Sequence, residues 1–284
     1  MDTIVNLKKF IKSNKATERS FRRMLRPYFW FCAQRVYFQS WLRKNGLSFS
    51  HKYDYIKEMK DTHKGEKCFI VATGPSLTFE DLDKLADSGE FSFGMNSCVL
   101  SLNKTKWIPD ILGVEDEYVY EKIEAALIKE SKEKLKDRIL ISHNVEQFFK
   151  TASQFKIFPQ NILDHKYDLH KYGTIKFSDD CHEVVYDAWS ILFSMCQFAV
   201  YMGFNEICFL GCDCNYNIPK AHFIEHGVKD AVADIVGERL IYVHGKFKEW
   251  AETKGVKVYN CTRGGMLEVY QRRSLEDVLN SISK

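Results

Sequence analysis

Histidine and carboxylate side chains, which transfer protons in many enzymes, follow several short apolar runs of this 284-residue sequence. Asp213 ends the run EICFLGCD, His222 follows it in the same stretch, and His244 begins a second, helix-like stretch. Imidazole titrates near neutrality, so a histidine beside a ligand can accept a hydroxyl proton. We predict His222 as the first choice of catalytic base, His244 as the second, and Asp213 close to the ligand. The alternatives are surface or capping histidines, and an aspartate that ties down its own loop.

A Gly-Pro-Ser turn is the next feature that suits chemistry. Gly74, Pro75 and Ser76 follow the strand-like run CFIVA and Thr73, and precede an acidic, helix-forming segment. Glycine permits close backbone approach, and N–H groups at a helix start attract anions. The turn therefore predicts a cradle for a phosphate or diphosphate, although Gly-Pro-Ser also occurs in ordinary loops. The sequence contains neither G-x-x-x-x-G-K-[ST] nor G-x-G-x-x-G, which disfavours a P-loop or a dinucleotide-binding turn.

Polar residues also follow the other apolar runs. Carboxylates at Glu115 and Asp116 can bridge Mg²⁺ to a diphosphate, or can cap the helix that begins near Tyr118. Arg263 can clamp a phosphate, or can be a solvated residue of a glycine-rich turn. The remaining candidates at predicted strand ends are Asn96, Ser97, Thr262 and Gly264.

Strand-like and helix-like segments alternate after Gly65. The predicted strands are CFIVA, FSFGMN, DILGVE, RILISHN, EICFLGCD and VKVYNCT, and Val184 to Phe204 form one long apolar segment that predicts a buried helix. This alternation is typical of an α/β fold, here a Rossmann-like, doubly wound, mostly parallel sheet with helices on both faces. In such a sheet the ligand lies outside the carboxyl ends of the strands, where the candidate residues are. We assign residues 66–284 to this Rossmann-like domain, which would carry the catalytic site.

Residues 1–65 form a basic N-terminal helical extension. They carry 15 Lys and Arg against 5 Asp and Glu, whereas residues 66–284 carry 26 against 33. Phe21, Leu25, Tyr28, Phe29, Cys32 and Val36 recur at helical spacing, and the arginines fall elsewhere on the wheel. Two interpretations remain open: residues 1–45 contact an anionic membrane, or the helix packs on the main domain with a solvated arginine face.

Composition narrows the class of protein further. No run approaches the ~18 apolar residues of a membrane span, and the N-terminus lacks the features of a signal peptide. We expect a cytoplasmic protein that visits the inner face of the membrane. Nine scattered cysteines predict reduced thiols without structural zinc. The acidic main domain disfavours nucleic acid as a partner.

Several short motifs, taken in order, resemble one known superfamily. IVATGPSL resembles the opening GNGPSL of glycosyltransferase family 42, the bacterial lipooligosaccharide sialyltransferases, and of the 6-hydroxymethylpterin diphosphokinase-like proteins. GMNS resembles the second strand end of both groups, and IPDILGVEDE the Pro-Asp strand entry of the pterin kinase-like group. MGFNEICFLGCDCNY followed by AHF is similar to their Gly-x-Asp segment, and places His222 at the histidine of the pterin kinase-like group.

This resemblance implies a cytidine nucleotide-sugar site without a required metal or other cofactor. Gly74, Pro75 and Ser76 would line the phosphate side, and Asn96 would hydrogen-bond the nucleotide. Three departures accompany it: Thr73 replaces the asparagine of GNGPSL, AWSI replaces Arg-x-x-Ser, and Tyr216 alone stands for a tyrosine pair. The catalytic histidine of the sialyltransferases aligns near Glu238, six residues before His244.

The leading hypothesis is a glycosyltransferase of sialyltransferase type that acts in lipopolysaccharide or capsule polysaccharide biosynthesis. It would move a nonulosonic acid, such as sialic acid or a relative, from a CMP-activated donor to a glycolipid or surface-polysaccharide acceptor by inverting displacement. The basic extension supports this hypothesis, because a lipid-borne acceptor brings the enzyme to a membrane. The alternatives are a Mg²⁺-dependent diphosphokinase of the 6-hydroxymethylpterin type and a non-catalytic nucleotide-binding protein.

Overall fold

The computed structural model describes residues 15–164, 172–216, 222–224 and 233–280. Its centre is an eight-stranded sheet in the order β10-β9-β8-β1-β2-β3-β4-β5, in which every neighbouring pair is parallel. The strands are β1 Lys67–Val71, β2 Phe91–Met95, β3 Ile111–Val114, β4 Ile139–Ser142, β5 Lys156–Phe158, β8 Glu206–Leu210, β9 Lys257–Asn260 and β10 Gln271–Arg272. The predicted α/β, Rossmann-like fold is confirmed.

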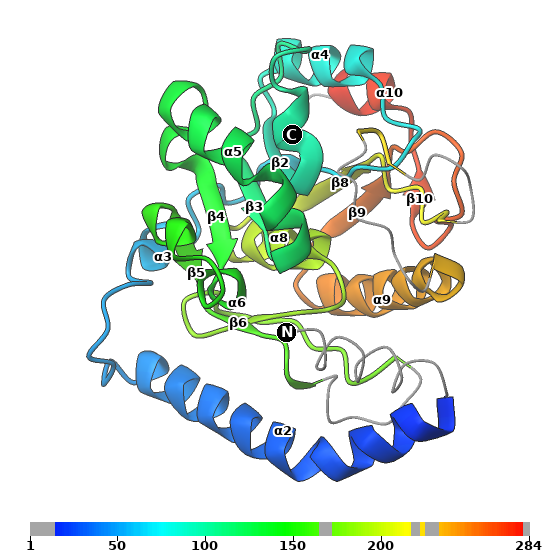
Figure 1. Ribbon diagram of the computed structural model, residues 1–284. Coiled ribbons are helices and arrows are strands. Elements are labelled where there is room, and N and C mark those ends of the chain that lie inside the picture. Colours follow the sequence, from blue (N-terminus) through cyan, green and yellow to red (C-terminus); the bar gives the residue numbers. More distant parts are fainter. Residues whose placement is uncertain (1–14, 165–171, 217–221, 225–232, 281–284) are drawn as a thin grey trace.

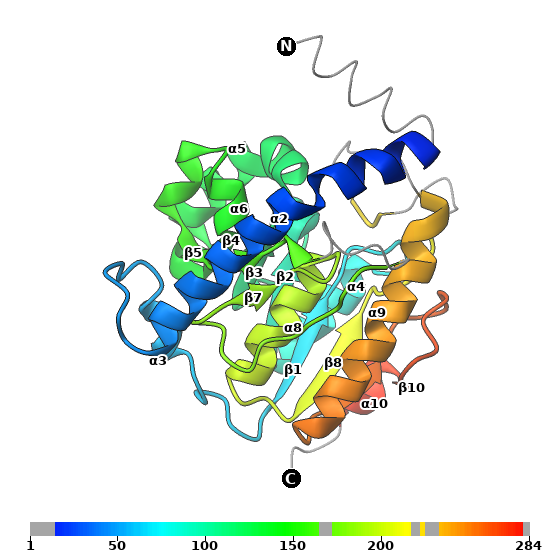
Figure 2. The same cartoon turned by 90° about the horizontal axis from the view of Figure 1, so that it is seen from below.

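The central strands are buried on both faces, which explains their continuous apolar sequences. All five residues of β1 are buried, and so are four of the five in β8, its direct neighbour. Helices cover both faces: α8 (Ile191–Tyr201) and α9 (Ala233–Thr253) lie on one side, and α4 (Phe79–Ser88) and α10 (Leu275–Asn280) on the other (Figures 1 and 2). The chain reverses its winding direction between β1 and β8, so the topological switch point lies at the carboxyl ends of these strands.

The long apolar segment that begins at Val184 is not one continuous helix. Val185–Tyr186 form β7, which pairs in parallel with β6 (Gln160–Asn161) as a separate two-stranded sheet. The helix α8 begins only at Ile191, because Ser190 adopts an extended backbone and its hydroxyl accepts from the amide of Leu192. The prediction of a helix from Val184 was therefore wrong in its first turns, where apolar residues serve a short strand and a turn.

Helix α5 (Glu117–Glu133) follows β3 as expected from the sequence. Short helical turns complete the other connections: α6 (His143–Glu146), η1 (Asn96–Ser101), η2 (Lys136–Arg138) and η3 (Lys150–Gln154).

The N-terminal extension is helical within its described part. Helix α2 (Lys15–Lys44) contains Pro27 and is bent along its length (Figure 1), and α3 (Tyr55–Glu58) follows it. Tyr53 and Ile56 belong to the same buried core as the sheet, so the end of the extension is packed into the main domain. The division at residue 65 stays a prediction, and residues 1–14 lie outside the described part.

Candidate functional site

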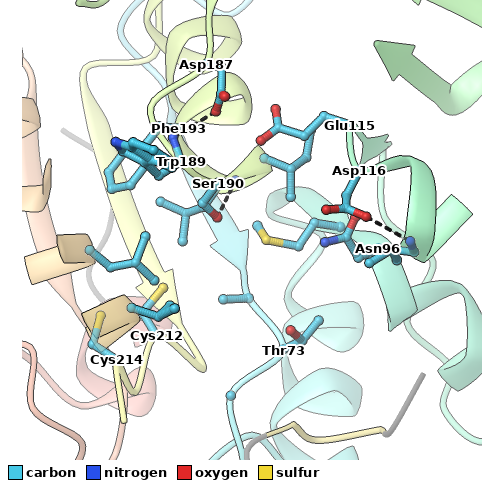
Figure 3. Close-up of a pocket in the computed structure, with 18 of the residues that line it drawn as sticks. Thr73, Asn96, Glu115, Asp116, Asp187, Trp189, Ser190, Phe193, Cys212 and Cys214 are labelled. Carbon is cyan, nitrogen blue, oxygen red and sulfur yellow. Dashed lines mark hydrogen bonds between the residues drawn. The ribbon is translucent and has the colours of Figure 1, made fainter. Parts of the chain in front are cut away.

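A cavity of about 460 Å³ lies at the carboxyl ends of the strands, at the switch point of the sheet. Loops after four strands supply its wall: Thr73 after β1, Asn96 after β2, Glu115 after β3 and Asp213 after β8. Figure 3 shows the labelled residues arranged around an open centre. This size is within the range of small-molecule sites, and the position is where parallel α/β sheets bind their ligands.

Asn96 lines this cavity and contains an unsatisfied polar atom. Its backbone has φ +46°, a left-handed conformation that asparagine tolerates better than most residues. Its carboxamide oxygen is buried and has no hydrogen-bond partner among the described residues. A buried acceptor without a partner is costly, so a ligand that donates an N–H or O–H group here would remove that cost.

Two helices direct their N-terminal ends at the cavity. Asp116 caps α5 by accepting from the amides of Tyr118 and Val119 at 2.8 and 2.9 Å, and Ser190 caps α8. Both caps line the cavity. The capping role that the sequence allowed for Asp116 is thus present, and the positive ends of two helix dipoles favour a negatively charged group in the space between them.

Glu115 lies at the wall of the cavity and is partly buried. Its Oε2 accepts from the Ser194 hydroxyl at 2.6 Å and from the Gln160 amide at 2.7 Å. Burial raises the pKa of Glu115 well above its usual range, and the nearby Asp187 carboxylate acts in the same direction. The protonated form is therefore favoured, and Glu115 can donate a proton or a hydrogen bond where an ordinary glutamate would only accept.

Sequence reasoning missed a group of cavity residues that lies before and beyond α8. Asp187 accepts from the amide of Trp189 at 2.7 Å, and Trp189 has φ +71°, a strained conformation for an aromatic residue. The guanidinium of Arg239, from α9, is 4.0 Å from the centroid of the Trp189 ring. The one signal in the sequence was Ser190 directly before a buried helix, which marks a cap. Nothing in the sequence showed that α9 would place Arg239 against the Trp189 ring.

His222 and Tyr216, both candidates from the sequence, line the cavity with ring centroids 6.2 Å apart. The chain next to His222 is fixed to the opening turn, because the amide of Phe223 donates to the carbonyl oxygen of Thr73 at 2.7 Å. The Phe223 ring also packs on Phe79 of α4. His222 is therefore held at the cavity edge, beside the turn after β1.

The Gly-Pro-Ser turn is only partly at the cavity. Thr73 and Gly74 line it, but a Cβ on Gly74 would lie 2.0 Å from Oδ2 of Asp213 and 2.4 Å from the carbonyl oxygen of Gly211. The close approach at Gly74 therefore serves the Asp213 loop rather than a ligand. Ser76 donates its hydroxyl to Asp213 at 2.8 Å, and neither Ser76 nor Pro75 is among the described residues that line the cavity. The anion cradle expected at Pro75 and Ser76 is occupied by this carboxylate.

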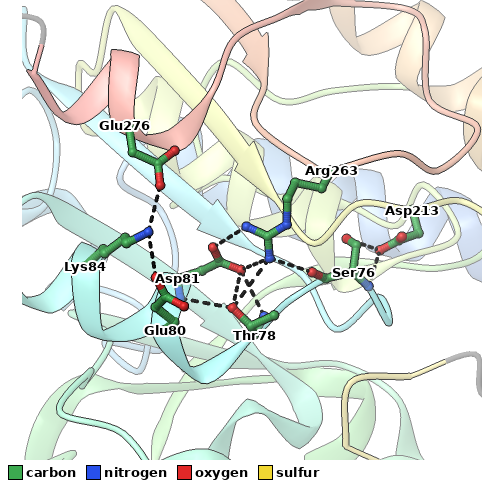
Figure 4. A network of polar contacts seen from close by, with 8 residues as sticks. All are labelled: Ser76, Thr78, Glu80, Asp81, Lys84, Asp213, Arg263 and Glu276. Carbon is green, nitrogen blue, oxygen red and sulfur yellow. Dashed lines mark hydrogen bonds and ion pairs between the residues drawn. The ribbon is translucent and has the colours of Figure 1, made fainter.

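The loop after β9 closes the same corner from outside (Figure 4). Arg263 donates to both oxygens of Asp81 at 2.6 and 2.5 Å, and Asp81 completes a capping box with Thr78 at the start of α4. Thr262 is buried and accepts from the amide of Cys212 at 2.9 Å. Neither Arg263, Thr262 nor Gly264 lines the cavity among the described residues, so the predicted phosphate clamp is instead a structural ion pair.

Two further candidates belong to the interior. His244 reaches the cavity wall but is buried between aromatic rings, and burial lowers the pKa of its imidazole to about 3. Tyr270 donates to the His244 carbonyl oxygen at 2.9 Å, and its hydroxyl is also hydrogen-bonded to Nδ1 at 3.0 Å. Such an imidazole is a weak base at neutral pH. Ser97 is buried in η1, outside the described cavity lining.

The residues at the cavity do not form a ready magnesium site. Within the described residues, no three His, Cys, Asp or Glu side chains are grouped as metal ligands. Asp116 is engaged as a helix cap, and Glu115 is hydrogen-bonded and favoured in its protonated form. Mg²⁺ prefers ionised oxygen ligands, so the Glu115-Asp116 pair predicted from the sequence does not fit it in this arrangement. Asp213 is also engaged, and the pKa of its carboxyl is raised by burial.

These observations define a parallel α/β protein with an anion-receptive cavity at its switch point. The chain belongs to the family described as 6-hydroxymethylpterin diphosphokinase MptE-like, whose profile matches residues 44–219, more than half of the sequence. The predicted resemblance to the 6-hydroxymethylpterin diphosphokinase-like proteins is thus confirmed. The match begins at the last residue of α2 and ends at residue 219.

Two solved structures are similar to this chain at low sequence identity. The MAf glycosyltransferase from Magnetospirillum magneticum AMB-1 is 15% identical, with a TM-score of 0.47 over 81% of this chain and 40% of that chain. The sialyltransferase CstII from Campylobacter jejuni, in complex with the substrate analogue cytidine-5'-monophosphate, is 13% identical, with a TM-score of 0.43 over 74% of this chain and 85% of that chain. This chain therefore spans less than half of the Magnetospirillum protein. No curated protein matches the sequence.

Proposed function

We propose that the cavity binds the nucleotide part of a CMP-activated nonulosonic acid and that the protein transfers the sugar to a glycan acceptor with inversion. The observation that carries this proposal is the convergence of the α5 and α8 N-termini on one cavity, beside the carboxamide oxygen of Asn96, which has no partner among the described residues. Helix N-termini suit the phosphate, and the Asn96 acceptor suits a hydroxyl or amino group of the nucleoside.

Several carboxylate residues surround the cavity, and ionised carboxylates would repel the phosphate of the proposed donor. Desolvation favours the protonated form of Glu115, Asp116 accepts from two orphan amides of α5, and Asp213 is hydrogen-bonded to Ser76. Arg239 adds positive charge at the wall. The carboxylates are thus largely protonated or hydrogen-bonded, which leaves the space between the helix ends receptive to a phosphate.

The proposed reaction needs a base and a stabilised leaving group. The acceptor hydroxyl loses its proton to His222 while its oxygen forms a bond to the anomeric carbon of the donor. The bond from that carbon to the phosphate oxygen breaks, and CMP leaves with the bonding electrons. The N-termini of α5 and α8 stabilise the charge that develops on the departing phosphate.

Ligand-induced stabilisation in thermal unfolding tests the nucleotide site. CMP without Mg²⁺, at 100 times its dissociation constant, should raise the free energy of unfolding by about 2.7 kcal/mol. Asn96→Gly keeps the left-handed backbone but removes the carboxamide, and should weaken CMP binding about tenfold. Ser97→Ala is the matched control, because Ser97 lies outside the described lining. Equal CMP binding by the wild type and Asn96→Gly would contradict the assignment of Asn96.

Release of CMP from CMP-sialic acid in the presence of glycan acceptors tests the chemistry. His222→Ala should reduce turnover by about 10² to 10⁴, the usual contribution of a general base, with little change in CMP binding. Full turnover by His222→Ala would remove this residue as the base.

The family match favours a second candidate, the Mg²⁺-dependent diphosphokinase. It predicts that ATP with Mg²⁺ stabilises the protein, and that a hydroxymethylpterin is converted to its diphosphate. In the same experiments, stabilisation by ATP and Mg²⁺ but not by CMP would favour the kinase and reject the transferase. Stabilisation by neither nucleotide would reject both.

A further inference from the structure

The outer face of α2 carries a stripe of large apolar side chains. Met24, Tyr28, Phe31 and Phe38 follow each other at steps of four, three and seven residues, which places them on one side of the helix. All four are exposed, Phe31 by 68%. We call these four residues the α2 stripe. Trp30 and Trp41, also exposed, lie beside it.

The opposite face of α2 is already occupied by the protein itself. Ala33 and Ser40 are buried against the main domain, and Leu25, Phe29 and Val36 are partly buried. Tyr28, which helical spacing grouped with Leu25, Phe29 and Val36, instead belongs to the α2 stripe. The helix therefore has an apolar face toward its own domain and a second apolar face toward solvent. Exposed apolar surfaces of this kind mark sites that contact a partner or a membrane.

Positive charge accompanies the α2 stripe. Arg35, four residues after Phe31, is exposed on the same side of the helix, Arg23 is exposed next to Met24, and residues 1–65 carry 15 cationic against 5 acidic side chains. Phe49, a few residues beyond the helix, is fully exposed. Aromatic rings among arginines suit the interface of an anionic bilayer, whereas two copies of this basic surface would repel each other.

Contacts connect α2 to the wall of the cavity. The Tyr37 hydroxyl donates to Asp164 at 2.6 Å, two residues beyond the cavity residue Ile162. Arg43 donates to the carbonyl oxygen of Glu183 at 2.8 Å, just before β7 and the cavity residue Asp187. Figure 2 shows α2 crossing the molecule next to β7. A membrane under α2 would therefore lie close to the segments that form the cavity.

From these observations we infer that the α2 stripe and its flanking arginines dock the protein on an anionic lipid surface. The apolar side chains enter the boundary between headgroups and acyl chains, and the arginines remain at the headgroup level. Among the described helices none is long and apolar enough to cross a bilayer. In this inference α2 lies on the membrane surface. This inference concerns binding alone and does not depend on the reaction at the cavity.

Co-sedimentation of the full chain with vesicles tests the inference. Binding to phosphatidylglycerol-containing vesicles should exceed binding to pure phosphatidylcholine vesicles, and should fall as salt is raised. Replacing two rings together, Phe31→Ser and Phe38→Ser, should lower the partition coefficient at least about tenfold, because two large apolar groups no longer enter the interface. Met266→Ser, which removes an equally exposed apolar side chain from the loop before β10, should leave it unchanged.

A second pair of variants isolates the charge. Arg23→Gln with Arg35→Gln should weaken binding to anionic vesicles about tenfold or more, at about 1 kcal/mol per residue, while Lys132→Gln on α5 should not. Circular dichroism and thermal unfolding show whether each variant is folded. The phenylalanine pair tests the apolar contribution to binding, and the arginine pair tests the electrostatic contribution separately. Absence of binding by the wild type, or equal binding by the Phe31/Phe38 variant, would overturn the inference. So would vesicle-independent dimerisation that the same substitutions abolish, because a second copy would then cover the stripe.

Discussion

Glu115 shows how a single residue can combine the demands of packing and of a ligand site. Ser194 and Gln160 both donate to one of its oxygens, so the environment satisfies a hydrogen-bond acceptor but does not supply a full positive charge. Desolvation and Asp187 therefore raise the pKa of the carboxyl, and ionisation in the folded state is disfavoured. A raised carboxyl pKa in a cavity is a common property of functional sites.

The same residue gives a prediction for the pH dependence of stability. Because the folded-state pKa of Glu115 is raised, its stabilising contribution is complete below the unfolded pKa of about 4.3 and is lost as pH rises toward the folded pKa. The loss approaches about 1.4 kcal/mol per pH unit within that window. Glu115→Gln retains an oxygen acceptor without the charge, so its stability relative to wild type should grow as pH rises from 4 to 8.

Urea unfolding at several pH values measures this difference. Glu121→Gln, on the exposed side of α5, is the control, and its difference from wild type should not grow with pH. If the stability of Glu115→Gln also stays a constant amount from wild type over the whole range, the buried carboxyl is not protonated and our account of it is wrong.

At the scale of the elements, the turn after β1 depends on glycine for an intramolecular reason. Gly74→Ala would place a methyl group 2.4 Å from the Gly211 carbonyl oxygen and closer still to Asp213, so the backbone or the Asp213 loop must move. We expect a loss of about 1–3 kcal/mol in the free energy of unfolding. Gly245→Ala is the matched variant, because its Cβ would meet nothing within 4 Å inside α9, and it should gain about 0.5–1 kcal/mol.

Chemical denaturation of both variants decides the point, since the two identical substitutions should change stability in opposite directions. A stable Gly74→Ala protein would show that the Asp213 loop yields readily. In that case the turn would be free to approach a ligand, as the sequence alone suggested.

The elements also show why some features could be predicted and others could not. Short apolar runs such as CFIVA predicted the strands because a parallel sheet buries both faces of each strand. The start of α8 was predicted too early in the sequence. A short apolar run such as the one around Val185 suits both a buried strand and a buried helix, and periodicity does not distinguish the two. Arg263 was a candidate for a phosphate, but its partner Asp81 lies 182 residues away, and no local pattern announces such a pair.

At the scale of the whole molecule, specific side-chain contacts connect the basic extension to the acidic domain. Asp164 is buried to 96%, and it accepts from the Tyr37 hydroxyl of α2 and pairs with Lys176 at 2.9 Å. Asp164 follows β6. The backbone amides of Val185 and Asp187 donate hydrogen bonds to the carbonyl oxygens of Pro159 and Asn161, and these bonds hold β6 to β7. Helix α2 thus holds the small sheet that supplies one side of the cavity.

Tyr37→Phe should therefore affect more than the helix that carries it. Loss of a hydrogen bond to a charged group should lower the free energy of unfolding by about 1.5–3 kcal/mol. Because α2 restrains β6 and β7, hydrogen exchange should accelerate at their amides and remain unchanged in β1 and β8 at the centre of the sheet. Tyr118→Phe removes a hydroxyl from an exposed side chain of α5 and should change neither measurement. Faster exchange confined to α2 would mean that the helix and the cavity wall are energetically separate. Docking of α2 on a membrane would then position the protein without altering its site.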